Sequence, residues 1–364
     1  MNRELSVYFD LLRFIACLAV LLYHSNMRNI ITEPIALSNY GHSAVIVFFV
    51  LSGYVISFVT DKKENTLLAY SASRFARIYS VALPALVITP FLDIIGEHFN
   101  SNFYIDKTTH DFWHIRIISG LFFLNEIWFI SIMEFSNVPY WSLCYEAWYY
   151  ILYGTFVFTS GRKRILLISA ILLIIGPKIL LLFPTWALGV FIYKKKSLRD
   201  IPEKWGWILF IGSFVIFTMF NIFEVAEYFN EMTKTTVGDE WYKLLTFSKF
   251  FIGDYILALI ISMNFLGFRT ISHRCKRLFK ILENSSRKIA NHTFALYLLH
   301  QPLILFFAAV LSGNPENSIF YIKTMLCVAA SVYLLAKVTE NKKSTYKLIF
   351  LKIAKHHDKS IHNN

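Results

Sequence analysis

Charged residues are scarce in this sequence. Asp, Glu, Lys and Arg together make up 16% of the 364 residues, against roughly 25% in soluble domains, whereas 56% are hydrophobic and 17% are aromatic. A soluble domain has no use for so many apolar runs, so the composition predicts a polytopic membrane protein. The four cysteines form no close pair, so neither a disulfide framework nor a zinc site is predicted.

Acidic residues are fewer than basic residues, and the formal net charge is +12. Such an excess points to nucleic acid only when the basic residues sit on a folded soluble domain. Here they fall in short segments between apolar runs, as the positive-inside rule expects, so we predict no nucleic-acid partner. The sequence also lacks the H-E-x-x-H, P-loop, G-x-S-x-G and C-x-x-C signatures. The usual support for a zinc protease, an NTPase or a serine hydrolase is therefore absent, and we predict no metal ligands.

Apolar segments able to cross a bilayer recur along the chain. The first contains charged residues and lacks a small-residue cleavage site, so we expect it to remain as a membrane helix. The candidate spans are residues 5–25, 42–60, 78–96, 141–160, 163–177, 179–193, 205–222, 250–268, 289–311 and 319–337. Basic clusters between the spans predict about ten crossings with both termini in the cytoplasm. We therefore predict an all-α membrane domain over residues 1–340 and a basic cytoplasmic tail over residues 341–364.

Two stretches do not fit a simple span. Segment 114–132 is apolar, but the charge count leaves no crossing for it, so we expect it to be re-entrant or to lie on the outer surface. Segments 163–177 and 179–193 are each shorter than the roughly 20 residues that an untilted span needs. A break near Gly176 and Pro177 separates them, and we predict that they go out and return as a pair.

Ionisable residues interrupt the first apolar segment. At about 100° per residue, Asp10, Arg13 and His24 fall on one side of a helix, and the last two lie roughly 16 Å apart along it. An ionisable side chain inside a membrane helix usually faces the protein interior or an aqueous cavity. The other interpretation is that Asp10 and Arg13 reach the cytoplasmic interface while His24 reaches the opposite headgroups. Because the three residues share one stripe of the helix, we favour the interpretation that they face the protein interior or a cavity and mark a functional path.

Glu146 lies in an aromatic stretch, YWSLCYEAWYYILY, with no Lys or Arg within ten residues on either side. An unpaired carboxylate in a membrane segment is costly, so a partner from another helix, such as His24 or Arg13, is attractive. The alternative interpretation is that Glu146 lies at the outer interface beside Trp141 and is solvated.

Three further features each have a plain structural interpretation. Arg74 and Arg77 form an R-x-x-R pair whose guanidinium groups could bind phosphates, or they are ordinary positive-inside charge. Ser52 and Gly53 interrupt an apolar run, and close helix packing alone explains such small residues. His300 falls near the middle of its span, where a satisfied core histidine is the plain interpretation.

Taken together, five motifs resemble the integral-membrane acyltransferases of the acyltransferase-3 type, which O-acylate polysaccharides and other extracytoplasmic acceptors. The motifs are FDLLRFIACLAVLLYH from residue 9, FFVLSGYVIS at 48–57, R-x-x-R at 74–77, WSLxxE at 141–146 and LYLLHQPL at 296–303. Each motif alone is weak, but all five occur in order, and the resemblance covers roughly residues 5–340. The family is similar in having about ten spans with both termini in the cytoplasm.

The resemblance implies transfer of an acyl group, usually acetyl from cytoplasmic acetyl-CoA, to a hydroxyl of a polysaccharide or a lipid-linked oligosaccharide. The protein would lie in the cytoplasmic membrane of a bacterium, among membrane lipids, and acyl-CoA would be a substrate and not a permanently bound cofactor. His24 would act as a general base or a transient acyl carrier, since the unperturbed pKa of histidine lies near neutrality. Arg13, Arg74 and Arg77 would engage the CoA phosphates or stabilise developing charge, and Glu146 would orient the imidazole.

The resemblance thereby implies three groups of site residues. They are His24, Glu146 and Arg13 for catalysis; Arg74, Arg77, Ser52 and Gly53 for the donor; and Trp141, Ser142, Asp10, Tyr297 and His300 for the acceptor. The chain departs from the family at Cys144 and Ala147, where relatives often have other residues, and a role for Cys144 as acyl carrier has no support. It also contains no SGNH-type esterase domain, so acceptor transfer would fall to the membrane domain or to a separate partner.

Two other functions stay open. A transporter of lipid-linked oligosaccharides would also have ten helices with intramembrane Arg, His and Glu, but carriers tend to show paired broken helices, and the break within 163–193 has no counterpart. A polysaccharide polymerase would act through large outer loops, and the longest one here, 223–249, is modest.

Overall fold

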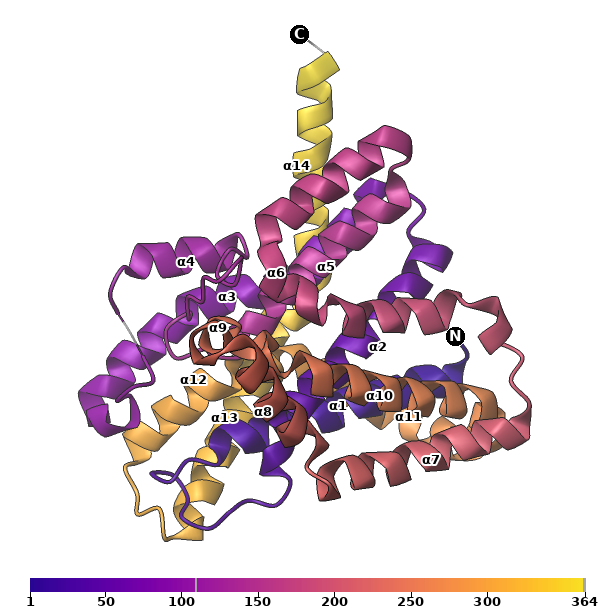
Figure 1. Ribbon diagram of the computed structural model, residues 1–364. Helices are drawn as coiled ribbons and strands as arrows, with labels where there is room; N and C mark the ends of the chain where they lie inside the picture. Colours follow the sequence, from indigo (N-terminus) through magenta and orange to yellow (C-terminus); the bar gives the residue numbers. More distant parts are fainter. Residues whose placement is uncertain (109, 363–364) are drawn as a thin grey trace.

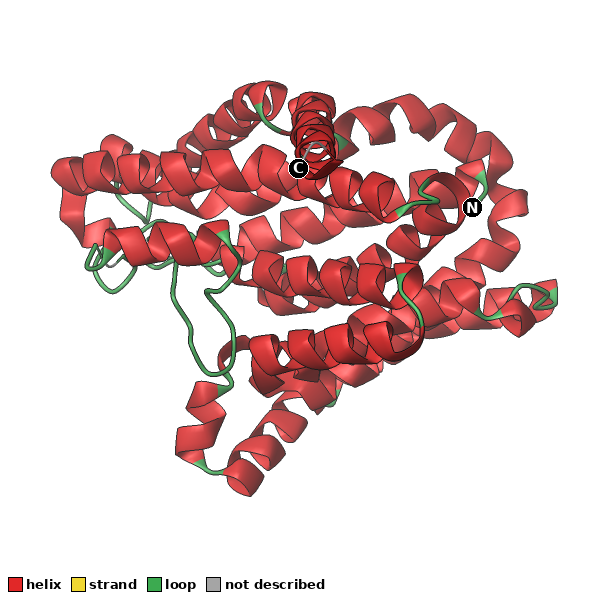
Figure 2. Ribbon diagram, turned by 90° about the horizontal axis from the view of Figure 1, so that it is seen from above, coloured by secondary structure: helices red, strands yellow, loops and turns green. Residues whose placement is uncertain are grey.

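The computed structural model describes residues 1–108 and 110–362, with side chains described up to residue 354, and this part of the chain contains no β-strand. Helices make up most of it, and loops connect them (Figure 2). The α-helices are α1 Arg3–Ser25, α2 Gly41–Lys63, α3 Leu67–Asn100, α4 Trp113–Leu121, α5 Tyr140–Phe158, α6 Gly161–Lys194, α7 Glu203–Ile222, α8 Val225–Val237, α9 Asp239–Leu244, α10 Phe251–Ile271, α11 Lys276–Ala290, α12 Thr293–Leu311, α13 Ser318–Val338 and α14 Lys343–His362.

Eight helical segments of the described chain are long and apolar enough to cross a membrane. The prediction of an all-α, multi-pass membrane protein is confirmed, although the predicted number of spans was ten. Two of the predicted spans, 163–177 and 179–193, lie within the single element α6. The predicted span 141–160 forms α5, whose many tyrosine and tryptophan residues lower its hydropathy. Most of α5 is buried among the other helices, so it faces protein and not lipid.

Helix α1 packs against α2, α11 and α12 and lies near the middle of the bundle (Figure 1). Asn2 caps its first turn by accepting a hydrogen bond from the Leu5 amide at 3.0 Å. At the other end of the chain α14 packs along α3 and then projects from the bundle (Figure 1). The predicted tail 341–364 is therefore helical as far as residue 362, and residues 363–364 lie outside the described part.

Helix α3 is longer than predicted. It begins at Leu67, well before residue 78, and its 34 residues extend about 50 Å. That length exceeds the apolar core of a bilayer, which is roughly 30 Å thick. Helix α3 is therefore longer than the apolar core is thick, and its first turns carry Arg74 and Arg77.

Helix α6 breaks at Gly176, whose φ of 71° and ψ of −174° suit only glycine. A Cβ atom at this position would lie 2.6 Å from the Cα atom of Trp128. The Trp128 amide donates to the Ile175 carbonyl and its indole donates to the Leu173 carbonyl, each at 2.9 Å, so carbonyls freed by the break are satisfied. The two halves of α6 run in different directions (Figure 1).

The segment 114–132 does not span the membrane. Its only α-helix, α4, has nine residues, about 14 Å, and the chain then continues as an irregular, largely buried loop up to Tyr140. Within the loop Glu126 forms an ion pair of 2.5 Å with Lys178 of α6, and both side chains are fully buried. This pair ties the loop to the break in α6.

Candidate active site

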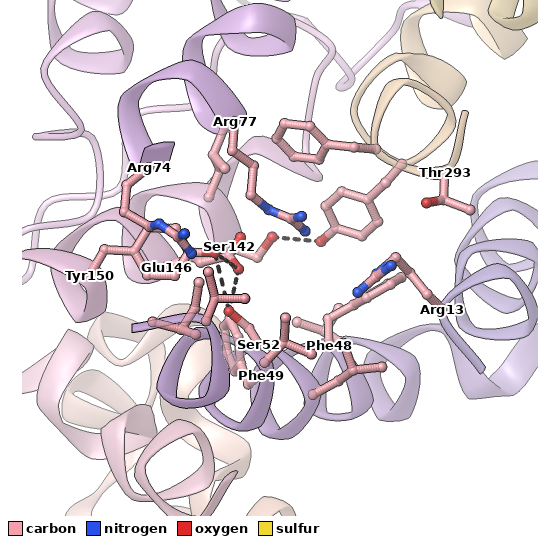
Figure 3. A pocket seen from close by; sticks show the side chains of 18 residues that line it. Arg13, Phe48, Phe49, Ser52, Arg74, Arg77, Ser142, Glu146, Tyr150 and Thr293 are labelled. Carbon is pink, nitrogen blue, oxygen red and sulfur yellow. Dashed lines mark hydrogen bonds between the residues drawn. The ribbon is translucent and has the colours of Figure 1, made fainter. Parts of the chain in front are cut away.

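A cavity of about 170 Å³ lies where α1, α2, α3, α5 and α12 meet. Figure 3 shows side chains from these helices converging on it. Its polar lining residues are Arg13, Ser52, Arg74, Arg77, Ser142, Glu146, Tyr150, Thr293 and Tyr297. Six of these, from Arg13 to Glu146, together with Tyr297, belong to the predicted site, so the structure brings together motifs that are far apart in the sequence.

Glu146 is held inside this cavity by two hydroxyl groups. Its Oε1 atom accepts a hydrogen bond of 2.6 Å from Ser52 and one of 2.5 Å from Tyr150 (Figure 3). The Trp186 indole in turn donates to the Ser52 hydroxyl at 3.2 Å. Hydrogen bonds to a charged acceptor are stronger than neutral ones, so the carboxylate has a defined orientation.

Guanidinium groups surround the carboxylate. Arg74 pairs with Glu64 at 2.6 Å, and Arg13 pairs with Asp10 at 3.1 Å, one turn earlier on α1. Arg77 points into the cavity (Figure 3) and forms no ion pair within the described residues, although its guanidinium lies over the ring of Phe294. A cationic group with no fixed counterion is suited to bind an anionic ligand.

The cavity continues into a second, polar space of about 280 Å³ toward the N-terminal end of α1. Both spaces are lined by Arg13, Arg77, Thr293 and Phe294. The second space, which we call the vestibule, is additionally lined by Asp10, Arg287, Ala290, Asn291, Glu340 and Lys343. Its cationic groups outnumber its carboxylates, so an anion that enters meets a favourable potential on the way to Arg77.

His24 does not line the cavity. It lies at the C-terminal end of α1, eleven residues from Arg13, and its ring centroid is 5.1 Å from that of His300. The sequence suggested that His24 could be the partner of Glu146. The structure does not pair them, because Glu146 lines the cavity and His24 lies outside it.

His300 is buried, and its Nδ1 atom lies 3.0 Å from the Leu296 carbonyl. Since a carbonyl only accepts, Nδ1 carries the hydrogen and Nε2 holds a free lone pair. Nε2 has no partner in the described chain. An unpartnered buried acceptor is costly, so it marks a group that is available to a neighbour or a ligand.

A row of neighbouring polar side chains, which we call the file, leads from the cavity to the two histidines. The hydroxyls of Ser142 and Tyr297 both line the cavity and lie 2.6 Å apart. The ring of Tyr297 is 6.4 Å from that of His300, and His300 adjoins His24. The predicted acceptor residues Ser142, Tyr297 and His300 are thus neighbours in space.

Two predicted site residues have packing roles instead. A Cβ atom at Gly53 would lie 2.0 Å from the Trp186 carbonyl oxygen, so this glycine permits the close approach of α2 and α6. Trp141 is buried and stacks on Phe247, with ring centroids 4.3 Å apart. Neither residue lines the cavity. Asp10 lies in the vestibule, close to Arg287, and not beside the predicted acceptor residues.

Sequence reasoning did not assign several polar residues of the cavity and the vestibule, among them Tyr150, Thr293 and Glu340. Tyr150 lies four residues after Glu146, and this helical spacing could have revealed it. Thr293 and Glu340 carry no such signal. Glu340 accepts hydrogen bonds from the amides of Phe294 and Ala295 at the start of α12, across 45 residues or more of chain.

Comparison with known proteins agrees with this arrangement. The model of an acyltransferase domain family, the acyltransferase-3 type, matches residues 6–337. The chain is 25% identical over 350 residues to the peptidoglycan O-acetyltransferase OatA of Listeria monocytogenes, an alignment that covers 87% of this chain and 52% of that protein. It is 30% identical over 155 residues to the O-acetyl transferase of Shigella phage Sf6, which covers 41% of this chain and 45% of that protein. The chain thus spans about half the length of these curated relatives. No solved structure gives a significant match.

Proposed function

Because the chain belongs to the acyltransferase domain family of the acyltransferase-3 type, we propose that it is a membrane-embedded O-acetyltransferase. The donor is acetyl-CoA, and the acceptor is a hydroxyl of a cell-surface polysaccharide or a lipid-linked oligosaccharide. The observation that carries the proposal is the cavity itself, in which Arg13, Arg77 and Glu146 meet inside a bundle of membrane helices and open to a basic vestibule.

The vestibule is the binding site for the nucleotide part of the donor. CoA carries several phosphate charges, and guanidinium groups bind phosphate oxygens through paired N–H donors. Arg77 and Arg13 contribute to both spaces, so they hold the phosphates while the pantetheine arm passes into the cavity. Arg74, already paired with Glu64, supports the local positive potential.

The thioester then has to reach His24. Arg13 and His24 lie roughly 16 Å apart along one face of α1, and the pantetheine arm spans this distance beside the file of Ser142, Tyr297 and His300. Nε2 of His300 accepts a hydrogen bond from one ring nitrogen of His24 when the two rings turn toward each other. The other ring nitrogen of His24 then presents a lone pair to the acceptor.

In the transfer step the acceptor hydroxyl gives its proton to this nitrogen of His24 while the oxygen attacks the thioester carbon. A C–O bond forms and the C–S bond of the tetrahedral intermediate breaks. The proton on the imidazolium passes to the leaving sulfur, so the products are the acetyl ester and CoA with its thiol.

The test is transfer of labelled acetyl from acetyl-CoA to isolated surface glycan by the protein reconstituted in liposomes. His24→Ala should abolish transfer while leaving expression and membrane insertion intact, because it removes the only proposed base. His273→Ala is the matched control, since His273 is exposed and pairs with Glu203 away from the cavity. Wild-type activity in His24→Ala would remove His24 from the catalytic role.

A comparison of cells with and without the gene separates the transferase from the other two candidate functions. Loss of glycan acetyl ester with unchanged chain length supports the transferase. Loss of surface glycan altogether supports a transporter, and shortened glycan supports a polymerase.

A further inference from the structure

A second large pocket, of about 580 Å³, lies at the opposite end of α1 from the vestibule, between the start of α2, the end of α7, α8 and the start of α10. The described lining residues of this pocket and of the cavity have no member in common. The stripe of α1 that carries Arg13 and His24 faces α12, whereas this pocket lies on the side of α2 and α10. We call it the head-group pocket.

The head-group pocket contains a histidine–carboxylate pair formed by residues 212 positions apart. His42 Nε2 lies 2.9 and 3.1 Å from the two carboxylate oxygens of Asp254, and Asp254 is only 3% exposed. Phe250 packs against the imidazole edge to face, with ring centroids 4.7 Å apart. The pair engages Nε2, so Nδ1 of this fixed ring is available to a ligand.

The chemistry of the lining favours an uncharged ligand with many hydroxyl groups. Glu224, Glu227 and Asp254 all line the pocket, together with three asparagines and the aromatic rings of Tyr40 and Phe250. Carboxylates accept hydrogen bonds from hydroxyls, and asparagine both donates and accepts them. No Lys or Arg is among the described lining residues, so a phosphate would be repelled. The volume and the aromatic rings suit an organic ligand and not a bare metal ion.

An apolar groove of about 480 Å³ adjoins the head-group pocket. Leu37, Tyr40, Ser43 and Leu257 line both. The groove runs between α1, α2, α7 and α10, and hydrocarbon side chains such as that of Phe217 make up nearly all of its walls. A polar pocket that continues into an apolar groove is complementary to an amphiphile, with its head in the first and its chain in the second.

We propose that the head-group pocket binds an uncharged sugar residue of a glycolipid and that the groove takes the hydrocarbon chain of the same molecule. The inference rests on the proposed function only in its choice of a glycan as the ligand class. It adds a binding site, built on His42 and Asp254, that is separate from the acyl-donor cavity.

The test uses the full chain in phosphatidylcholine nanodiscs and two photoreactive probes that share one alkyl chain. One probe carries a glucose head group and the other carries a phosphate head group. The glucoside should label peptides of α7 and α10 at least tenfold more than the phosphate probe does, and excess unlabelled alkyl glucoside should suppress this labelling. Equal labelling by both probes would overturn the proposal, because the chain alone would then determine binding.

Three variants locate the site. Glu227→Gln and Asp254→Asn should each reduce glucoside labelling by about tenfold, as expected when a charged hydrogen-bond acceptor is replaced by a neutral one. Glu227 is exposed, so its variant tests the proposal even where replacement of the buried Asp254 impairs folding. Ala19→Phe should reduce labelling by both probes, because it fills the groove. Glu240→Gln is the control, since Glu240 is exposed on α9 and does not line the pocket.

Acetyl transfer measured in the same preparations separates this inference from the proposed function. If the wild type transfers no acetyl group but labelling follows the head group and Glu227, the proposed function fails and the glycolipid site stands. If transfer occurs but labelling depends neither on the head group of the probe nor on Glu227, the proposed glycolipid site is wrong and the proposed function stands.

Discussion

The two ends of this helical bundle differ in the sign of their charge. The vestibule at the N-terminal end of α1 is lined by Arg13, Arg77, Arg287 and Lys343, whereas the head-group pocket at the other end has three carboxylates and no Lys or Arg among its described lining residues. An anionic ligand is favoured at one end and repelled at the other. In the function proposed above, this difference would direct the polyphosphate-bearing donor to one end and the hydroxyl-bearing acceptor to the other.

Among the variants that compare the two ends, the largest effect is expected from replacing Arg77, one of the two arginines that line both the cavity and the vestibule. Arg77→Ala should lower kcat/KM for acetyl-CoA about 10- to 100-fold, since a hydrogen bond to a charged group contributes about 1.5–3 kcal/mol. Arg77→Lys should recover only part of the loss, because an ammonium cannot form the paired contact of a guanidinium. Steady-state kinetics with varied acetyl-CoA measure this, and Arg162→Ala, on the exposed first turn of α6, serves as control. An equal loss for donor and acceptor would mean that the two ends are not separate.

The carboxylate of the cavity is expected to act on turnover. Glu146→Gln keeps the side-chain size but removes the charge that faces the arginines and accepts hydrogen bonds from Ser52 and Tyr150. We expect kcat to fall about tenfold or more, with a smaller change in KM for acetyl-CoA. The kinetics of Ser52→Ala should change in the same direction, since it removes one of these bonds. Unchanged kcat in both variants would limit Glu146 to helix packing.

A substitution in the head-group pocket is expected to have a smaller effect, and only on the kinetics of the acceptor. Glu227→Gln should raise KM for a glycolipid acceptor several-fold while leaving KM for acetyl-CoA unchanged, because only the acidic pocket is altered. The same kinetic assay with varied acceptor measures this. A change in the acetyl-CoA constant instead would contradict the assignment of ligands to ends.

The smallest effect on catalysis is expected from a residue that lines neither the vestibule nor the head-group pocket. Glu134, in the loop between α4 and α5, is 2% exposed, and neither of its carboxylate oxygens has a hydrogen-bond partner among the described residues. Burial raises the pKa of this carboxyl well above its usual range. The folded protein therefore binds the Glu134 proton more tightly than the unfolded chain does. This preference stabilises the folded state fully below about pH 4, and the stabilisation is lost as the pH rises toward the pKa of Glu134 in the folded state.

Glu134→Gln should therefore remove part of the decrease in Tm that the wild type shows between acid and neutral pH. Both KM values should stay as in the wild type. Thermal unfolding of the detergent-solubilised protein at a series of pH values measures this. Parallel Tm curves for the two proteins would mean that Glu134 ionises without cost in the folded state.

Much of the fold and part of the site could be predicted from the sequence. Apolar runs and basic clusters located the membrane helices, and the helical spacing of Asp10 and Arg13 placed both on the face that lines the cavity or the vestibule. Motif resemblance singled out Arg77, Glu146 and Ser142, which meet in the cavity. Gly53 and Trp141 share those motifs but serve packing, and residue type alone does not separate the two roles.

The amino-acid sequence by itself determined which segments leave water and which side chains face one side of each helix, because hydropathy and the 3.6-residue period are local properties. Only the tertiary structure decided that His24 adjoins His300 and not Glu146, that Glu340 joins the vestibule, and that His42 meets Asp254. Such pairings depend on how helices pack across tens to hundreds of residues. The surrounding side chains, and not the spacing along the chain, determine which of several polar groups become neighbours.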